Sequence, residues 1–554
     1  MRKLLTNQLL PSQLHNQTRR QFLKRSGLLA SAGAVVANGL WLPSHAYAST
    51  ASAVVETDKG KVKGYIDEGI SVYKGIPYGA NTGGANRFKP PRPAVAWKGV
   101  LEAVKYGPIA PQSIDASGAL NAGESEDCLK LNVWTPEPNS NKKRPVMFWC
   151  HGGGFTTLSS STPNYDGTNL AIRGDVVVVT INHRLNTMGF THMESQGGED
   201  FAGAGAAGML DLVAGLKWVQ RNIEQFGGDP ERVMIFGESG GGRKVGTLLA
   251  MPAAKGLFHR AVIQSGPSLR LVSETDGAEL AQKLMNKLGL KKGDMRALQA
   301  LDPGKIIAAY QSLSQEPGFQ PMLNGFAPVV DGITLPASSF HPTASTANPD
   351  VPLIVGANRT EMTLFLRGNR ALFSLDDAGL MKSVAGLVGA NKAKDVIEVY
   401  KAAQPKASPS EVFFLIASDH RYVAPCTTIA ERRSDLKTAP VYSYYLTWAT
   451  NTFGGSLMTP HALDIPFVFD NTETEHTTAG FTTGTEEERA LAAKVSSTWI
   501  EFARSGNPNA GTLPTWKPFT RTQRNTMVIN NNSENVIDPI ASRREIMQDV
   551  LGLS

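Results

Sequence analysis

The sequence predicts an α/β fold in which helices cover a doubly wound, mostly parallel sheet that is preceded by antiparallel strands. Segment 60–66 is a short alternating stretch of the kind that indicates an antiparallel strand. Segment 175–181 is a nearly continuous β-branched run, as expected for a strand that is covered on both faces. Apolar residues then recur at helical spacing from Met209 to Ile223, so a helix returns the chain before the next strand. Alternation of this kind favours a doubly wound sheet.

A serine on a sharp turn follows one of the predicted strands. Residues 237–241 read Gly-Glu-Ser-Gly-Gly and come directly after the apolar run 233–236. A nucleophile carried between a strand and a helix requires small residues two positions before and after it, because the backbone doubles back there. Glycine and serine are also common in ordinary turns, but the preceding strand favours a catalytic role. We therefore predict that Ser239 is a nucleophile.

A glycine run follows an earlier predicted strand. The apolar segment 146–150 continues into His151 and then into three glycines. Because glycine has no side chain, the N–H groups of such a loop can approach a substrate closely and stabilise a developing oxyanion. The loop would act together with the N–H group of the residue that follows the nucleophile. The candidate oxyanion hole is therefore Gly153, Gly154 and Gly240.

Further short motifs occur in one order along almost the whole chain, at residues 73–78, 87–91, 126–134, 222–230, 264–266 and 328–332. Together with the two glycine motifs, they make the chain resemble the type B carboxylesterases. This family includes bacterial para-nitrobenzyl esterases, mammalian carboxylesterases, cholinesterases and the non-catalytic neuroligins. The resemblance implies an α/β-hydrolase fold in one large domain, residues 49–554, which hydrolyses small to medium organic esters through an acyl-enzyme.

A serine hydroxyl becomes a good nucleophile only when a base takes its proton and an acid orients that base. On this fold the expected order along the chain is serine, acid, histidine. His461 is the favoured base, because segment 459–469 resembles the family's histidine loop before an apolar strand. His420 and His476 are the competitors, and both are expected to be surface groups.

The acid is expected in a loop that follows a strand. Segment 351–361 has this character, and the resemblance places the triad carboxylate at Glu361. Asp331 is the alternative, although its Val-Val-Asp-Gly setting is typical of a tight turn. The resemblance also places polar groups around the triad at Glu238, Ser265 and Asp464, which could equally be hydrogen-bonded core residues.

Two other functional classes remain open. A thioesterase or an amidase would use the same nucleophile, acid and base, whereas a neuroligin-like binding module would share the fold without catalysis. The intact set of serine, acid and histidine favours an enzyme. Cholinesterases bind a quaternary ammonium on a tryptophan ten residues before the cysteine of the Glu-Asp-Cys motif, and Gly118 occupies that position. The sequence therefore does not favour a choline ester.

No cofactor or metal is predicted. Residues 203–208 match Gly-x-Gly-x-x-Gly and Asp229 follows them, but a dinucleotide-binding loop must follow a strand and this segment does not. The three cysteines lack the spacing of a metal site. Cholinesterase-like relatives pair the cysteine that corresponds to Cys128, but the partner position is Ala110, so a free buried thiol is expected.

Residues 1–48 are expected to be a targeting peptide. They contain six Lys or Arg, including the pair Arg19 and Arg20, but no Asp or Glu, and an apolar run follows at 27–42. The small-x-small sequence at 46–48 fits a signal peptidase site. This pattern is typical of a twin-arginine signal, which makes the export machinery a partner of the precursor and the mature protein periplasmic or secreted. An uncleaved membrane anchor is the alternative.

The remainder of the chain is electrically balanced, because it contains 49 basic and 49 acidic residues. A neutral chain has no general attraction to polyanions, so neither nucleic acid nor an anionic membrane surface is a predicted partner. No segment after residue 48 is predicted to span a membrane. The expected partner of the mature protein is a small-molecule ester.

Arg243 and Lys244 fall where related esterases carry small residues just after the nucleophile turn. A cation in the first turns of a helix opposes the positive end of the helix dipole, at a cost of roughly 0.3–1 kcal/mol. A structural role therefore requires a carboxylate partner or an exit to solvent. For Arg243 we favour pairing with a buried acid that is remote from substrate. The alternative is that Arg243 lends positive potential to the acyl pocket and favours esters that bear a second carboxylate.

Overall fold

The protein is described from a computed structural model that covers residues 50–317, 319, 326–474, 480–509 and 513–553. The chain divides into two units, Met1–Thr50 and Ala51–Ser554, and the fold below belongs to the second unit. The predicted targeting peptide, residues 1–48, and the competitor histidine His476 lie outside the described residues.

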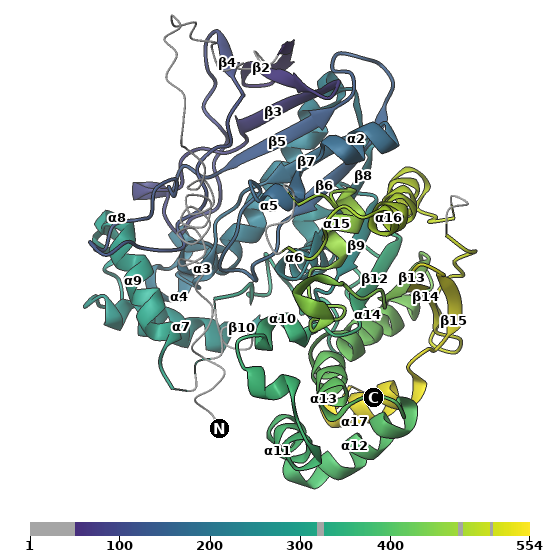
Figure 1. Cartoon of the computed structure of the whole chain (residues 1–554). Helices are drawn as coiled ribbons and strands as arrows, with labels where there is room; N and C mark the ends of the chain where they lie inside the picture. The colour runs from purple at the N-terminus through teal and green to yellow at the C-terminus, as the bar shows by residue number, and fades with distance from the viewer. Residues whose placement is uncertain (1–49, 318, 320–325, 475–479, 510–512, 554) are drawn as a thin grey trace, which may run out of the picture. The chain divides into compact units, whose positions relative to one another are not determined.

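Strands alternate with helices along most of the chain (Figure 1), and all of the strands below belong to the main sheet except β10 and β11, which pair with each other in a separate two-stranded sheet. The strands are β1 (Ala51–Thr57), β2 (Gly60–Asp67), β3 (Ile70–Pro77), β4 (Val100–Glu102), β5 (Lys130–Thr135), β6 (Arg144–Cys150), β7 (Val177–Ile181), β8 (Gly228–Glu238), β9 (Arg260–Gln264), β10 (Val272–Ser273), β11 (Val329–Val330), β12 (Leu353–Asn358), β13 (Val441–Leu446), β14 (Asn525–Ile529) and β15 (Glu534–Ile537). The helices are α2 (Thr168–Gly174), α3 (Asn186–Phe190), α4 (Glu194–Gly197), α5 (Ala207–Asn222), α6 (Gly240–Leu248), α7 (Glu274–Lys287), α8 (Met295–Ala300), α9 (Pro303–Ser314), α10 (Met362–Leu366), α11 (Asp377–Val388), α12 (Ala390–Ala403), α13 (Pro409–Ser418), α14 (Ala424–Ser434), α15 (Asp464–Phe469), α16 (Glu486–Ser505) and α17 (Ala541–Leu551).

The described residues form a 13-stranded sheet in the order β1-β2-β3-β5-β7-β6-β8-β9-β12-β13-β14-β15, with β4 beside β2. Within the block β7-β6-β8-β9-β12-β13-β14 of this order, neighbouring strands are parallel. Antiparallel pairs lie at both sides of this block, from β1 to β7 and between β14 and β15. The predicted parallel sheet with an antiparallel lead-in is therefore confirmed.

Each face of the sheet contributes to its own apolar core, because successive side chains of a strand point to opposite faces. In β6, Val146 and Phe148 pack with residues of α5, α6 and α14, whereas Met147 and Trp149 pack with residues of α2, α15 and α16. Figure 1 shows α5 on one side of the central strands and α2 and α16 on the other. A sheet covered in this way leaves the carboxyl ends of its strands as the place for a site.

One predicted element has a different structure. The apolar run after His461 was expected to be a strand, but Asp464–Phe469 forms the short helix α15. A short apolar run that is buried on all sides cannot be assigned to helix or strand by its periodicity. All six residues of α15 are buried, and the apolar ones pack in the core that α16 covers.

A continuous helical segment passes beside the site. Helix α13 leads directly into the π-helical turn η8 (Asp419–Val423), which leads directly into α14. A π turn inserts an extra residue into a helix and is frequent at functional sites. Helix α13 belongs to a third apolar cluster with α11, α12 and α17, and this cluster holds the amino-terminal end of the segment. Among the helices of the described ranges, none is both long and apolar enough to cross a membrane.

Candidate active site

Ser239 lies on the turn between β8 and α6. Its backbone angles, φ 58° and ψ −119°, lie in a region that residues with a side chain rarely adopt. Such a conformation costs of order 1–3 kcal/mol and persists only where neighbouring contacts enforce it. Here the N–H group of Ser239 donates to the carbonyl of Gln264 at 2.8 Å, and its own carbonyl accepts the N–H group of Arg243 at 3.1 Å. The turn therefore has the strained geometry of a nucleophile elbow.

The glycine loop after β6 packs directly against this turn. A Cβ atom on Gly240 would lie 2.1 Å from the carbonyl oxygen of Gly154. The glycine loop and the turn therefore could not pack this closely if residue 240 carried a side chain. A Cβ atom on Gly152 would lie 3.7 Å from Cβ of Ser239. Gly153 and Gly154 have φ angles of 80° and 64°, which glycine adopts without strain.

The N–H groups of this region are available to a ligand. Within the described ranges, no hydrogen-bond acceptor faces the N–H groups of Gly153 and Gly154. Gly240 is the first residue of α6, where N–H groups have no partner inside the helix. The three glycines expected to form an oxyanion hole are thus brought together beside Ser239.

His461 and Glu361 form a short, buried hydrogen bond. Nδ1 of His461 lies 2.6 Å from Oε2 of Glu361, and the backbone N–H group of His461 donates to the carbonyl of Glu361. The other carboxylate oxygen of Glu361 accepts from the Ser265 hydroxyl and from the N–H group of Asn358, both at 2.6 Å. Glu361 is fully buried. A carboxylate fixed in this way holds the imidazole with Nε2 free to take a proton.

The second ring nitrogen of His461 faces another acid. Nε2 lies 3.1 Å from Oε1 of Glu238, the residue before Ser239. No group in the described part of the chain forms a hydrogen bond with Nε2, so the bond to the Ser239 hydroxyl is not made here. Such catalytic contacts are often long before substrate binds.

Burial and charge shift the pKa values of this pair. Burial lowers the pKa of His461, but the carboxylates of Glu238 and Glu361 outweigh it and raise the pKa above its ordinary value. Burial raises the pKa of Glu238, and the charge of Asp464 raises it further against the opposing effect of His461. At 3.1 Å, Glu238 contacts the base directly. The sequence had placed it only in a supporting position around the triad.

Asp464 supports the site without contacting His461. Its carboxylate accepts from the Gln264 side chain at 2.9 Å and from the Tyr444 hydroxyl at 2.8 Å. Burial raises the pKa of Asp464. The backbone carbonyl of Gln264 accepts the N–H group of Ser239, so Gln264 links Asp464 to Ser239 through two hydrogen bonds.

The competitors lie elsewhere. Asp331 accepts the N–H groups of Ile333 and Leu335 and so closes a tight turn, as its sequence setting indicates. His420 is half-buried in η8, and burial together with the charge of Arg421 lowers its pKa to about 4. His420 was expected to be a surface group, and it is only partly exposed.

The two cations after the elbow have no carboxylate partner in the described ranges. Lys244 is fully buried, and its Nζ donates to the carbonyls of His151 at 2.8 Å and Gly152 at 3.4 Å. Burial lowers the pKa of Lys244 to about 7. The expectation that Lys244 pairs with a carboxylate or reaches solvent is thus wrong. Lys244 instead holds the start of the glycine loop. The favoured pairing of Arg243 with a buried acid is also wrong.

Comparison with known proteins shows which family the chain resembles. Residues 51–545 match the model of the carboxylesterase family. The para-nitrobenzyl esterase of Bacillus subtilis is 35% identical over 500 residues, which cover 89% of this chain and 98% of that protein. The chain belongs to the carboxylesterase family.

Other relatives of this carboxylesterase agree. A fatty acyl-CoA hydrolase precursor from Anas platyrhynchos is 32% identical over 85% of this chain and 87% of that protein. The crystal structure of a Geobacillus stearothermophilus carboxylesterase matches with a TM-score of 0.77 and 36% identity, covering 89% of this chain and all of that one. The α/β-hydrolase fold and the serine ester hydrolase activity predicted from the sequence are confirmed, and the non-catalytic binding module is not.

Sequence reasoning missed two aromatic residues of the carboxylesterase site. The rings of Phe365 and Tyr422 lie 4.9 and 4.8 Å from the imidazole of His461, between ring centroids. They come from α10 and η8, so no local pattern around His461 indicates them. Cys128 is free and buried, as predicted. The described residues hold no cluster of three or more His, Cys, Asp or Glu that could bind a metal.

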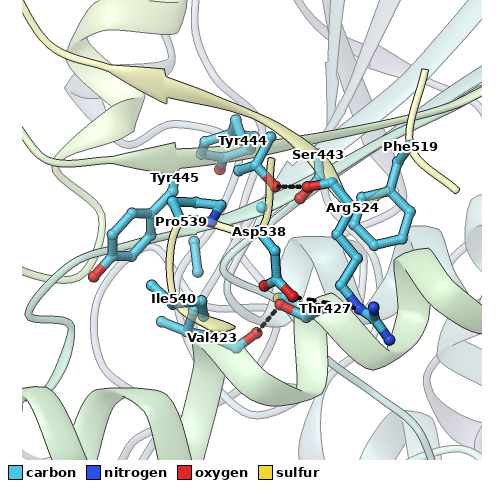
Figure 2. Close-up of a pocket in the computed structure, with 14 residues that line it drawn as sticks. Val423, Thr427, Ser443, Tyr444, Tyr445, Phe519, Arg524, Asp538, Pro539 and Ile540 are labelled. Atoms are coloured by element: carbon cyan, nitrogen blue, oxygen red, sulfur yellow. Dashed lines mark hydrogen bonds and ion pairs between the residues drawn. The ribbon is translucent and has the colours of Figure 1, made fainter. Parts of the chain in front are cut away.

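A pocket elsewhere in the carboxylesterase lies between β12, β13, β14 and α14 (Figure 2). Its charged wall residues are already engaged, because Arg524 donates to Glu431 at 2.8 Å and lies 3.9 Å from Asp538. Neither the nucleophile candidate nor its acid and base line this pocket. It is therefore separate from the candidate active site.

Proposed function

We propose that this carboxylesterase hydrolyses small to medium organic esters through an acyl-enzyme on Ser239, with His461 as general base and Glu361 as the acid that orients it. One observation carries the proposal. Nδ1 of His461 lies 2.6 Å from the Glu361 carboxylate, and its other ring nitrogen, Nε2, faces Glu238, the residue before Ser239. The base thereby lies at the strained turn that carries the nucleophile.

The proposed reaction has two half-reactions. Ser239 Oγ attacks the ester carbonyl carbon while His461 Nε2 takes the hydroxyl proton, and the N–H groups of Gly153, Gly154 and Gly240 stabilise the oxyanion. The C–O bond to the alcohol then breaks, and His461 returns the proton to the leaving oxygen. Water repeats the sequence on the acyl-enzyme and releases the carboxylic acid and free Ser239.

Glu238 is expected to set the pH at which this base works. His461 must be neutral to accept the proton of Ser239, and the negative charge of Glu238 favours the protonated imidazole. In Glu238→Gln the pKa of His461 falls, so the acidic limb of the kcat/KM profile moves to lower pH by about one unit or more. Initial rates between pH 5 and 10 measure this shift.

The matched control is Glu231→Gln, which removes the same charge from the exposed, opposite end of β8. Its acidic limb should coincide with that of the wild type. An unchanged limb in Glu238→Gln would show that Glu238 does not act on the base.

Thioester hydrolysis is the second candidate, because one relative of the chain is named a fatty acyl-CoA hydrolase. The geometry described above suits any acyl transfer to water, amides included. We expect the oxygen ester to be the best substrate in a series of ester, thioester and amide that share one hexanoyl group. A higher kcat/KM for the thioester or the amide would reassign the activity.

We also propose that residues 49–554 are one exported catalytic domain and that residues 1–48 direct it to the twin-arginine machinery. The paired Arg19 and Arg20 support this, since such a pair is read by the export receptor. Expression in a bacterium that has this pathway should give a periplasmic or secreted protein whose intact mass lacks about the first 48 residues. Replacing both arginines by lysine should leave the precursor inside the cell. Export that persists in this variant, or a mature protein that retains Met1, contradicts the proposal.

A further inference from the structure

Arg243 lies one helical turn beyond the nucleophile. It follows Ser239 by four residues in α6, and its N–H group donates to the Ser239 carbonyl at 3.1 Å. Residues four apart share one face of a helix, and one turn rises about 5.4 Å. Arg243 therefore lies one turn into α6 from the N-cap position that Ser239 occupies, and two groups that contact His461, Glu238 and Tyr422, both act on its charge.

The guanidinium of Arg243 is not neutralised within the described residues. Its Nε is buried without a hydrogen-bond acceptor, and no carboxylate lies within ion-pair distance of the group. The neighbouring Lys244 shows the contrast, because its ammonium is fully buried and donates to two carbonyls. Arg243 is partly exposed instead. A cation that keeps its charge near solvent and has no internal acceptor is able to bind an anionic ligand.

The buried acids of the site are occupied by other groups. Glu361 accepts hydrogen bonds from Ser265 and Asn358 in addition to holding His461. Glu238 lies close enough for its charge to act on Arg243, but its Oε1 faces His461. The active site thus offers Arg243 no carboxylate of its own.

A second cation lies beside Arg243. Burial lowers the pKa of Arg243 to about 10, and the charge of Arg421 contributes to this effect. Arg421 belongs to the π turn η8, as does Tyr422, whose ring lies 4.8 Å from that of His461. The π turn therefore carries both a cation that acts on Arg243 and an aromatic ring that contacts the imidazole of His461, in a helical irregularity that is common at functional sites.

We propose that Arg243 binds a second carboxylate on the acyl part of the substrate, so that the enzyme prefers half esters of short dicarboxylic acids over neutral acyl esters. This inference rests on the acyl-enzyme mechanism proposed above. In the acyl-enzyme only the acyl part remains bonded to Ser239, and Arg243 is one turn away on the same helix. A short dicarboxylic chain spans about the rise of that turn, so its free carboxylate reaches the guanidinium.

The test compares three esters that differ in where they carry charge. The first two are the 4-nitrophenyl esters of hexanoic acid and of hydrogen adipate, which share a six-carbon acyl chain. The third is 4-carboxyphenyl hexanoate, which carries its charge on the leaving group. We expect the wild type to favour the adipate half ester, and Arg243→Met to lower the adipate-to-hexanoate ratio of kcat/KM about tenfold or more. Arg243→Lys should recover part of the ratio.

The control variant is Lys255→Met, which removes an exposed charge beyond the end of α6 and should leave all three rates unchanged. An adipate-to-hexanoate ratio that stays within twofold in Arg243→Met overturns the carboxylate subsite. A variant effect confined to 4-carboxyphenyl hexanoate overturns its assignment to the acyl part. If the wild type hydrolyses none of the esters, the proposed function fails instead, so the two failures are distinguishable.

Discussion

Replacing Ser239 by alanine is expected to lower kcat/KM for ester hydrolysis by about 10⁴- to 10⁶-fold, the range of losses found when single members of such a unit are removed. The substitution removes the oxygen that forms the acyl-enzyme and leaves every other group of the site in place. Residual turnover would come from direct attack of water on an ester whose carbonyl oxygen is bound in the proposed oxyanion hole of Gly153, Gly154 and Gly240. Steady-state rates on a 4-nitrophenyl ester measure the loss.

The fold should survive this change, because alanine keeps the Cβ atom and the backbone contacts of Ser239 do not involve its hydroxyl. The midpoint of thermal unfolding should therefore stay close to that of the wild type. Ser117→Ala, in an exposed loop, is the matched control and should retain full activity. A Ser239→Ala variant with more than a tenth of the wild-type rate would move the nucleophile to another residue.

The parts of the site that depend on local backbone were predictable from the sequence. The elbow and the glycine loop each need small residues at fixed offsets from a strand, and those offsets are visible in the order of amino acids. The sheet followed for the same reason, since continuous β-branched runs and helical spacing are local patterns. Glu361 and His461 were different, because they lie 100 residues apart and were assigned by family resemblance.

The remainder depends on contacts between distant segments. Nothing around Glu238 indicates that its carboxylate would face the imidazole of His461 at 3.1 Å. The π turn that places Tyr422 on the same ring is a tertiary feature as well. The pairing expected for Arg243 failed because it assumed that a buried acid would be free, whereas the acids of the site are engaged by the base and its supporting groups.

Charge is arranged unevenly around the base. Glu238 and Glu361 contact the imidazole, Asp464 lies nearby, and all three acids are buried. Arg243 and Arg421 lie close to Tyr422, whose ring contacts the same imidazole. In the proposed mechanism the acids stabilise the imidazolium that forms when Ser239 is deprotonated, and the cations favour a negatively charged acyl group. We therefore expect Glu238→Gln to change the pH profile and Arg243→Met to change the substrate preference.

Replacing His461 by alanine is expected to lower kcat/KM about as much as Ser239→Ala, because the serine hydroxyl then lacks a base. The double variant should be no worse than either single variant, since residues that act as one unit do not contribute additively. Glu361→Gln should be impaired but measurable. Its side chain keeps the shape of the acid but cannot stabilise the imidazolium with a charge, and removing a triad acid costs less than removing the base.

His420→Ala is the control for this series, because His420 is the competing histidine inside the described ranges and makes no hydrogen bond or ion pair with Ser239, Glu361 or His461. We expect His420→Ala to keep more than half of the wild-type rate. A fully active His461→Ala together with an inactive His420→Ala would transfer the base to η8. The 2.6 Å bond between His461 and Glu361 favours an active His420→Ala and an inactive His461→Ala, because an acid can align only the imidazole that it contacts.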